Sequence, residues 1–202
     1  MESSRERTRY NVKEHKIQLR SVISEKRKQI TEEEKQRMDA AICRRLTALA
    51  GFRYADEILT YSPLKNEVDI SEVNEAALKS GKLLAFPRCV PGTSNMDFYE
   101  VTSMDQLERG SFSIMEPRSD CRLWTPPEGK SVLCIIPAMA YDKDGYRLGY
   151  GKGFYDRFLA DRDVIKVGVV YSKFLVDYKL PRGRFDLAVN VIVTEKGCHF
   201  VR

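Results

Sequence analysis

Short apolar runs that alternate with helical stretches restrict the fold of this sequence more than any other feature. The apolar runs span residues 57–62, 83–86, 97–101, 132–136, 164–171 and 189–193. Between them, residues 71–80, with Ser71 as a possible cap, and a stretch that starts at 154–160 have helical character. Strands and helices in this order predict an α/β fold, a layered, mostly parallel sheet with flanking helices.

Two helices are predicted before the first strand. Residues 13–29 form a helical stretch rich in Lys and Arg. Thr31 and Glu34 then have capping-box spacing, in which Thr31 accepts a backbone N–H and Glu34 reaches back. Apolar residues recur on one face of the next helix until Gly51, where we expect it to end; they are Met38, Ile42, Leu46 and Leu49. We expect one domain over residues 1–202, with 1–12 a loosely ordered extension.

The composition excludes several classes of protein. No apolar run approaches the ~18 residues that a membrane span needs, and the charged segment before Lys13 lacks the apolar stretch of a secretory signal. We therefore expect a cytoplasmic protein without a membrane partner. Five cysteines without Cys-x-x-Cys spacing, beside only His15 and His199, predict free thiols and no zinc site.

The positive charge lies in the N-terminal quarter. Residues 1–50 hold 13 Lys and Arg against 8 Asp and Glu, which accounts for the whole net charge of +5. Such an excess could serve nucleic acid, a polyanionic ligand or only solubility. Few aromatic residues accompany the bases, so stacking on nucleic acid is poorly supported. We expect no nucleic-acid partner and a monomer.

A glycine-rich run at residues 147–157 predicts a phosphate site. Gly149, Gly151 and Gly153 allow backbone N–H groups to face an anion without Cβ interference. A helix that begins near Gly153 would add free N–H groups. Arg147, Lys152 and Arg157 supply positive charge, and Asp156 could hold Mg²⁺ beside a phosphate.

Two common nucleotide fingerprints do not match this run. A dinucleotide-binding loop needs its third glycine where Phe154 stands. A Walker P-loop needs Ser or Thr after its Gly-Lys, where this chain has Gly153. A tight strand-to-helix turn without a ligand remains the alternative.

The run Arg-Leu-Gly-Tyr-Gly-Lys-Gly-Phe-Tyr-Asp-Arg at 147–157 resembles the signature of the 5-formyltetrahydrofolate cyclo-ligase family, also called methenyltetrahydrofolate synthetases. Other segments resemble further family motifs, in family order over about residues 13–195. They are Lys16–Arg20, Asn66–Ile70, Phe86–Arg88, Gly110–Pro117, Ile136–Asp142, and the C-terminal Leu180-Pro181, Asp186 and Thr194-Glu195.

The resemblance implies an ATP- and Mg²⁺-dependent cyclo-ligase. Such an enzyme converts 5-formyltetrahydrofolate to 5,10-methenyltetrahydrofolate and releases ADP and phosphate. Because a formamide oxygen is a poor leaving group, the expected intermediate is an iminium phosphate formed by phosphorylation of that oxygen. A relative that binds folate or nucleotide without catalysis remains an alternative.

The resemblance also implies site residues. The expected catalytic residues are Lys152, Arg147 and Tyr155. The expected ATP-binding residues are Lys16, Arg20, Arg147, Leu148, Gly149, Tyr150, Gly151, Lys152, Gly153, Phe154 and Tyr155. The expected folate-binding residues are Tyr61, Ser62, Glu67, Tyr150, Gly151, Lys152, Gly153 and Phe154, and the expected Mg²⁺ ligands are Asp156 and Asp186. Without the resemblance, Glu67 would be an ordinary loop acid, Asp186 a turn residue, and Lys16 and Arg20 solvated cations.

Overall fold

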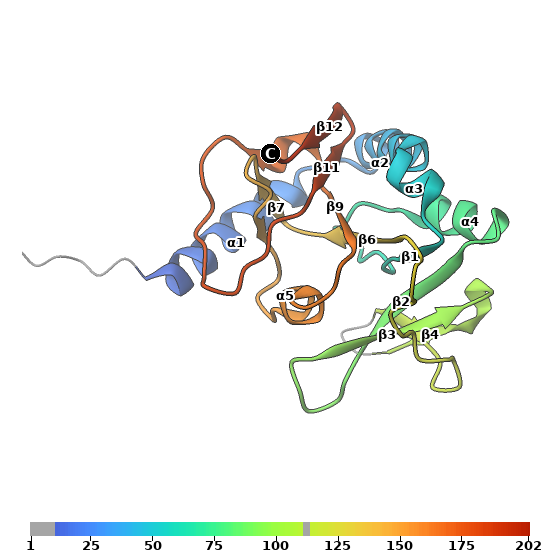
Figure 1. Ribbon diagram of the computed structural model, residues 1–202. Helices are drawn as coiled ribbons and strands as arrows, with labels where there is room; N and C mark the ends of the chain where they lie inside the picture. Colours follow the sequence, from blue (N-terminus) through green and yellow to red (C-terminus); the bar gives the residue numbers. More distant parts are fainter. Residues whose placement is uncertain (1–10, 111–113) are drawn as a thin grey trace, which may run out of the picture.

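The structure of the protein, a computed structural model, describes residues 11–110 and 114–202 (Figure 1). Residues 1–10 of the expected extension therefore lie outside the described residues, as do residues 111–113 of the Gly110–Pro117 motif. Within the described part, Asn11 caps helix α1 (Val12–Lys28), since its side chain accepts hydrogen bonds from the Lys13 and Glu14 N–H groups.

Seven strands form the central sheet, in the order β12-β11-β9-β6-β1-β2-β3. They are β1 (Glu57–Leu59), β2 (Leu83–Cys89), β3 (Met96–Val101), β6 (Val132–Pro137), β9 (Ile165–Val169), β11 (Val191–Thr194) and β12 (Gly197–Phe200). The five inner strands pair in parallel, and β3 and β12 are antiparallel edges. The predicted α/β fold with a mostly parallel sheet is confirmed.

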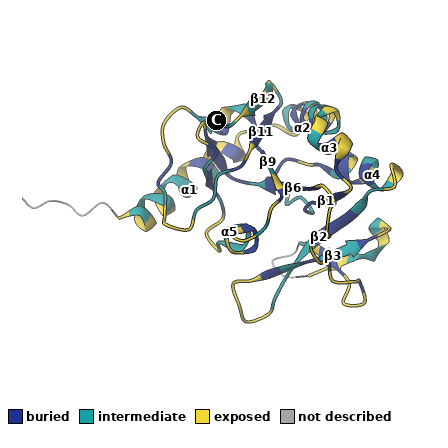
Figure 2. Cartoon of the chain, viewed as in Figure 1, coloured by how far each residue is buried: buried dark blue, intermediate teal, exposed yellow. Residues whose placement is uncertain are grey.

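Helices cover both faces of this sheet, which explains why the residues of β1 and β11 and nearly all of those of β6 are buried (Figure 2). Helix α2 (Glu32–Ala48) packs on β11, α4 (Ser71–Lys79) on β2, and α5 (Phe154–Leu159) on β3. The crossover from β1 to β2 and the crossover from β6 to β9 run in opposite directions. Right-handed crossovers then place α4 and α5 on opposite faces, as Figure 1 shows.

The order of the sheet reverses between β1 and β6. From β1 the chain moves toward β2, and from β6 it moves toward β9, although β1 and β6 are parallel neighbours. At such a switch point the loops after the two strands separate and leave a crevice at the carboxyl edge of the sheet. The loops in question are residues 60–70 after β1 and Ala138–Met139 after β6.

The predicted N-terminal helical pair is confirmed in α1 and α2. The Thr31 hydroxyl accepts a hydrogen bond from the Glu34 N–H (3.1 Å), while the Glu34 carboxylate pairs with Lys173 (3.0 Å). The prediction that Gly51 ends the second helix is wrong. Leu49 leaves the helical backbone (φ −59°, ψ 134°), and Gly51 lies within a further helix, α3 (Ala50–Tyr54).

Several short elements lacked a sequence signal. Residues 102–130, a region with many turn residues, contain the hairpin of β4 (Leu107–Arg109) and β5 (Met115–Pro117), preceded by the 3-10 helix η1 (Met104–Gln106). A second small sheet has the order β10-β7-β8, from β7 (Ala140–Asp142), β8 (Arg147–Leu148) and β10 (Leu175–Val176), which follows the 3-10 helix η3 (Ser172–Phe174). Ser71 begins α4 instead of capping it, and the Asp69 carboxylate accepts the Ser71 N–H (2.9 Å).

The buried hydrophobic residues form one core cluster, from Ile23 in α1 to Val193 in β11. All five cysteines are free thiols. Among the helices of the described residues, none is long and apolar enough to span a membrane.

Candidate functional site

A cavity of about 930 Å³ opens at the carboxyl edge of the sheet, where the loops after β1 and β6 separate. Its lining comes from α1, the loop after β1, strands β2 and β3, the glycine-rich run and the loop that contains Asp186. Among residues 147–155, all of them described, only Leu148 is not part of the lining. Its side chain is buried in the core, and its carbonyl accepts the Met139 N–H (2.9 Å).

The glycine-rich run connects β8 to α5 along one wall of this cavity. Gly151 has φ +100° and Gly153 has φ +68°, conformations that side chains rarely adopt. At Gly151 a Cβ atom would also lie 3.2 Å from Cζ of Arg20. Glycine is therefore needed at these two positions for backbone conformation, and at 151 also for close approach to α1.

Helix α1 presents two cations to this wall. Arg20 Nε donates a hydrogen bond to the Gly149 carbonyl (2.8 Å). Lys16 forms an ion pair with Asp186, whose Oδ2 also accepts the Gly183 N–H (2.7 Å). The structure thus brings Lys16, Arg20 and Asp186 together on one wall of the cavity.

A second ion pair lies beside the first. Arg147 contacts Asp156 Oδ1 through one terminal nitrogen (2.7 Å) and the Leu187 carbonyl through the other (3.2 Å). Asp156 Oδ1 also accepts the Leu187 N–H (3.1 Å). The Arg147 guanidinium lies 6.0 Å from the centre of the Tyr155 ring. Burial raises the pKa of Tyr155 well above its ordinary value, so its hydroxyl stays protonated.

Glu67 provides a buried carboxylate on the wall formed by the loop after β1. Its residue is 5% exposed, and Oε2 accepts the Leu64 N–H (2.9 Å). Burial raises the pKa of Glu67, while the hydrogen bonds from Leu64 and Tyr150 and the charge of Arg27 act in the opposite direction. A buried carboxylate of this kind suits a ligand edge with N–H donors.

Tyr61 and Ser62 lie between β1 and Glu67 and both line the cavity. The Tyr61 hydroxyl is engaged, since it donates to the Val68 carbonyl (2.7 Å). Ser62 Oγ is buried and has no hydrogen-bond partner among the described residues. A buried hydroxyl without a partner is rare, which makes Ser62 Oγ a natural contact for a bound polar group.

The two exposed cations of the glycine-rich run differ in position. Lys152 lines the cavity. Arg157, expected among the cations around the phosphates, is not part of the cavity lining. Its guanidinium donates instead to the carbonyls of Ser94 (2.8 Å from Nε) and Lys152, and so joins the glycine-rich run to the turn between β2 and β3.

Comparison with known proteins identifies the family. The family model described as the 5-formyltetrahydrofolate cyclo-ligase family matches residues 12–195. The chain belongs to this family. The family resemblance expected from the sequence, and with it the prediction of an enzyme of the cyclo-ligase type, is confirmed.

Members of the cyclo-ligase family resemble this chain along nearly its whole length. An NMR structure of 5,10-methenyltetrahydrofolate synthetase from Aquifex aeolicus superimposes with a TM-score of 0.79 at 36% identity and covers 93% of each chain. The 5-formyltetrahydrofolate cyclo-ligase of Mycoplasma pneumoniae is 32% identical over 187 residues, 88% of this chain and 97% of that protein. The Escherichia coli K12 protein of the same name is 29% identical over 177 residues, 86% and 96% of the two chains.

In this cyclo-ligase family member, sequence reasoning missed two buried charged residues near the cavity. Glu116 on β5 is 4% exposed and accepts the Cys89 N–H (3.4 Å), and burial together with Glu116 raises the pKa of Cys89 to about 11. Arg27, on α1, is 6% exposed. Glu116 stands in the Gly110–Pro117 motif, which was a signal without an assigned role, whereas Arg27 is one cation among several in its helix.

The donor set fits a magnesium ion that arrives with a nucleotide. Within the described chain, no group of three or more His, Cys, Asp and Glu side chains could hold a metal. The contacts of the two aspartates fall on Oδ1 of Asp156 and Oδ2 of Asp186, so each keeps a second oxygen. Mg²⁺ commonly uses one or two carboxylates together with phosphates and water, and both of these carboxylates belong to the lining of one cavity.

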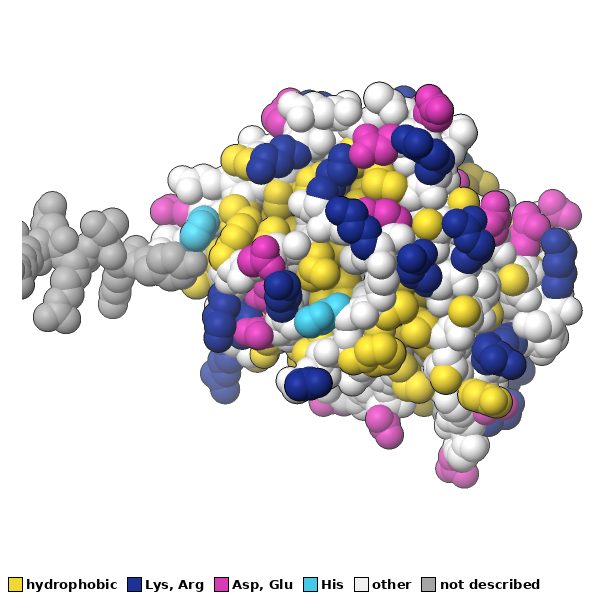
Figure 3. All heavy atoms as spheres, turned by 90° about the horizontal axis from the view of Figure 1, so that it is seen from above, with side chains coloured by type: hydrophobic (Ala, Val, Ile, Leu, Met, Phe, Trp, Pro, Cys, Tyr) yellow, Lys and Arg dark blue, Asp and Glu magenta, His cyan; other side chains and the backbone are white. Residues whose placement is uncertain are grey.

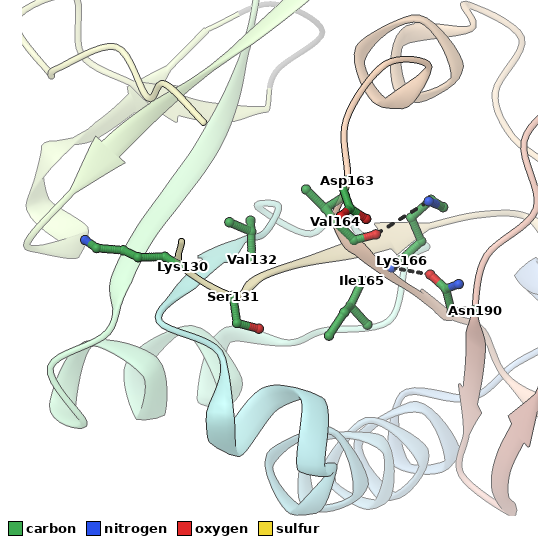
Figure 4. A pocket seen from close by; sticks show the side chains of 8 residues that line it. All are labelled: Lys130, Ser131, Val132, Asp163, Val164, Ile165, Lys166 and Asn190. Atoms are coloured by element: carbon green, nitrogen blue, oxygen red, sulfur yellow. Dashed lines mark hydrogen bonds between the residues drawn. The ribbon is translucent and has the colours of Figure 1, made fainter. Parts of the chain in front are cut away.

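A second cavity, of about 450 Å³, lies at the opposite, amino edge of the sheet (Figure 4). The Lys166 N–H donates to Asn190 Oδ1 (2.8 Å) and Lys166 Nζ to the Val164 carbonyl (3.5 Å). These bonds join neighbouring segments of the chain, and the labelled side chains do not converge on a common point (Figure 4). This cavity lacks the buried charges of the cavity at the carboxyl edge.

The basic excess of the N-terminal segment is partly used inside the molecule. Lys16, Arg20 and Arg27 contact other segments of the chain, and Lys35 pairs with Asp39 (2.6 Å). On the face shown in Figure 3, Lys and Arg side chains stand among acidic and apolar ones. No uninterrupted basic surface is visible on that face.

Proposed function

We propose that this chain catalyses the ATP-dependent cyclisation of 5-formyltetrahydrofolate to 5,10-methenyltetrahydrofolate, with release of ADP and phosphate. One observation carries the proposal. In this member of the cyclo-ligase family, a single cavity is lined both by a glycine-rich run with its cations and by the buried carboxylate of Glu67. The same cavity can therefore bind phosphates through the glycine-rich run and a ring with N–H donors through the carboxylate.

The reaction has two steps, and it requires both the nucleotide phosphates and the folate ring to be bound in this cavity. In the first step the formyl oxygen attacks the γ-phosphorus, the bond to ADP breaks, and an N5-iminium phosphate forms. In the second step N10 attacks the formyl carbon, the carbon–oxygen bond breaks, and phosphate leaves as N10 loses its proton. The enzyme must align the phosphate with the formyl oxygen and stabilise the charge of the transfer.

The glycine-rich run and α1 would hold the nucleotide phosphates. Residues 149–153 line the cavity, where their backbone N–H groups would bind phosphate oxygens, and Lys152, Lys16 and Arg20 supply positive charge. Arg147, which now pairs with Asp156 at the cavity wall, would contact a phosphate oxygen there. Tyr155, which stays protonated, can donate a hydrogen bond to an oxygen of the transferring group.

The loop after β1 would hold the folate. Glu67 is suited to accept hydrogen bonds from the pterin edge, and Ser62 Oγ is available to a polar group of the substrate. Tyr61, Tyr150 and Phe154 add ring surfaces along the cavity. With Gly151, Lys152 and Gly153 they complete the folate-binding set that the resemblance implied.

Asp156 and Asp186 would hold Mg²⁺ through the oxygens that their ion pairs leave available. When bound there, the ion neutralises charge on the β- and γ-phosphates of the nucleotide. Lys16 and Arg147, the present partners of these carboxylates, line the same cavity and would pair with the phosphates once the carboxylates hold the ion.

We further infer that the enzyme works in the cytoplasm as a single-domain monomer. Five free thiols fit a reducing compartment, and one continuous core cluster fits one domain.

The test is a spectrophotometric assay. Purified protein with 5-formyltetrahydrofolate, ATP and Mg²⁺ should form the methenyl product, followed by its near-ultraviolet absorbance, and should release one ADP for each product. Omission of ATP should abolish the signal. Lys152→Ala should lower kcat roughly 100-fold, because it removes a cation from the transfer site. Lys79→Ala, an exposed lysine of α4 paired with Glu75, is the matched control and should leave kcat unchanged.

Calorimetry with the same ligands separates the alternatives. Folate and nucleotide binding without turnover would identify a non-catalytic relative. Folded protein that binds neither ligand, under conditions in which the Escherichia coli relative is active, would refute the proposal. A wild-type rate in Lys152→Ala would remove that residue from the mechanism.

A further inference from the structure

Arg27 is a buried cation that the roles described so far leave unused. It lies in the last turn of α1 and is 6% exposed. One terminal nitrogen donates to the carbonyls of Ala138 (2.7 Å) and Met139 (2.9 Å), and the other donates to the Asn66 carbonyl. A single guanidinium therefore binds three carbonyls of two loops.

These two loops are the ones that separate at the switch point of the sheet. Asn66 directly precedes Glu67, the buried carboxylate of the cavity. Ala138 and Met139 join β6 to β7, and the Met139 N–H donates to the Leu148 carbonyl at the start of the glycine-rich run (2.9 Å). Arg27 thus connects the loop of the folate wall to the segment that positions the phosphate wall.

The surroundings hold the Arg27 side chain in one orientation. Its guanidinium carbon lies 4.9 Å from the ring centre of Phe174 and 5.9 Å from that of Tyr171. The Tyr171 hydroxyl donates to Asp39 Oδ1 (2.7 Å) and also lies 3.3 Å from the Glu67 carbonyl. The rings of Phe174 and Tyr171 near the planar guanidinium, together with the hydrogen bonds at its edge, leave the Arg27 side chain little rotational freedom.

Arg27 also acts on Glu67 through charge. The carboxylate is buried, and the positive charge of Arg27 is among the groups that favour its ionised form, against the effect of burial. A substitution at Arg27 would therefore affect both the place of the Glu67 backbone and the charge of its side chain.

We propose that Arg27 is a positioning residue that holds Glu67 and the glycine-rich run at a fixed separation, so that the folate ring lies with its formyl oxygen at the γ-phosphate. The inference rests on the proposed function. Lysine is a poor replacement, because one ammonium group cannot bond two loops in the planar fork that the guanidinium offers.

The first test compares ligand affinities in Arg27→Lys and Arg27→Met, with Lys28→Met, an exposed lysine one residue away, as the matched control. Calorimetry gives the Kd of 5-formyltetrahydrofolate and of ATP separately. We expect folate affinity to fall about tenfold or more in both Arg27 variants, the size of a lost hydrogen bond to a charged group. ATP affinity should change less than about threefold, and Lys28→Met should match the wild type.

A double-mutant cycle with Glu67→Gln tests whether Arg27 acts through Glu67. If it does, Arg27→Lys should weaken folate binding in the wild type but not further in Glu67→Gln. Equal, additive losses in both backgrounds would overturn the proposal. So would a parallel loss of folate affinity, ATP affinity and melting temperature in Arg27→Lys, which would assign Arg27 to general stability.

The proposed function and the role of Arg27 can fail independently. If the wild type does not bind 5-formyltetrahydrofolate, the proposed function fails. If the wild type binds and turns over folate while Arg27→Lys behaves as the wild type, only the positioning role is refuted. Because Arg27→Lys keeps the charge and most of the side-chain volume, it also guards against a variant that merely fails to fold.

Discussion

At the scale of single residues, the site carries its cations and anions as internal pairs. Lys16 with Asp186 and Arg147 with Asp156 are all partly or largely buried and lie at the same corner of the cavity. In the proposed function the cations serve phosphates and the carboxylates serve Mg²⁺. Ligand binding would then exchange partners instead of filling a site of unpaired charges.

Asp186→Asn should therefore have opposite effects on two ligands. The Lys16 cation loses its partner, so ADP in the presence of EDTA should bind roughly two- to fivefold more tightly, the size of a partly exposed ion pair. Turnover with Mg²⁺ and ATP should fall, because a metal ligand is lost. Calorimetry and the absorbance assay measure the two effects. Asp177→Asn, an exposed partner of Lys143, is the matched control, and unchanged or weaker ADP binding in Asp186→Asn would contradict the exchange.

Glu67 should make stability depend on pH. Its pKa is raised above the ordinary value near 4.5 by burial, so the folded chain holds this proton more tightly than the unfolded chain. The free energy of unfolding should then decrease as pH rises from about 4.5 through the folded pKa of Glu67. Glu67→Gln lacks this ionisation, so its free energy of unfolding should increase relative to that of the wild type between pH 4 and pH 8.

Denaturant melts of both proteins at several pH values measure this difference. If the difference in free energy of unfolding between the two proteins does not vary with pH, ionisation of Glu67 does not contribute to it. In the absorbance assay, the same variant should raise the KM for folate about tenfold, because the amide lacks the charge that strengthens a hydrogen bond.

At the scale of secondary structure, burial decided what could be predicted from sequence. The inner strands were found because helices cover both their faces, and so apolar residues predominate in them without strict alternation. Strands β7, β8 and β10 have two or three residues, too few for any period to show. Gly51 looked like a helix end but lies within α3, since the break falls at Leu49.

The candidate site could also be predicted only in part. The glycines and cations of residues 147–157 indicated a phosphate site by themselves, and the family resemblance added Lys16, Arg20, Glu67 and Asp186. Arg27 escaped because Lys26 and Lys28 flank it, and only the folded chain distinguishes the buried cation from its exposed neighbours.

The glycine-rich run supplies a matched pair of substitutions. Gly151→Ala places a Cβ at φ +100° and 3.2 Å from Arg20 Cζ, whereas at Gly149 a Cβ would meet nothing within 4 Å. We expect Gly151→Ala to lower kcat/KM for ATP about tenfold or more, because Arg20 and the run must move. Gly149→Ala should retain most activity. Steady-state kinetics check this, and equal losses in both variants would refute the steric account.

At the scale of the whole molecule, the site is an assembly of distant segments. The cavity joins α1, the loop after β1, the glycine-rich run and the loop with Asp186, and the Lys16–Asp186 pair spans 170 positions of sequence. The switch point between β1 and β6 supplies the crevice in which they meet. Ligands should bind only to the folded chain and not to the unfolded chain, since no single segment holds the whole site.

Thermal unfolding should report this dependence. At a ligand concentration of about 100 Kd, binding to the folded state adds roughly 2.7 kcal/mol, which for a chain of this size is a rise in Tm of about 5–10 °C. Differential scanning calorimetry with ATP and Mg²⁺, and separately with 5-formyltetrahydrofolate, measures the shift. A Tm that does not respond to saturating ligand would contradict binding at the cavity.

The pairing of Lys16 with Asp186 also has a consequence for biosynthesis. The ribosome synthesises α1 well before Asp186, which lies 170 positions after Lys16. Until Asp186 has been added, the nascent chain therefore carries its cationic helix without the acidic partner that will neutralise it. The proposed site can form only after Asp186 has been made, so an incomplete chain that ends before this aspartate would lack one side of the site.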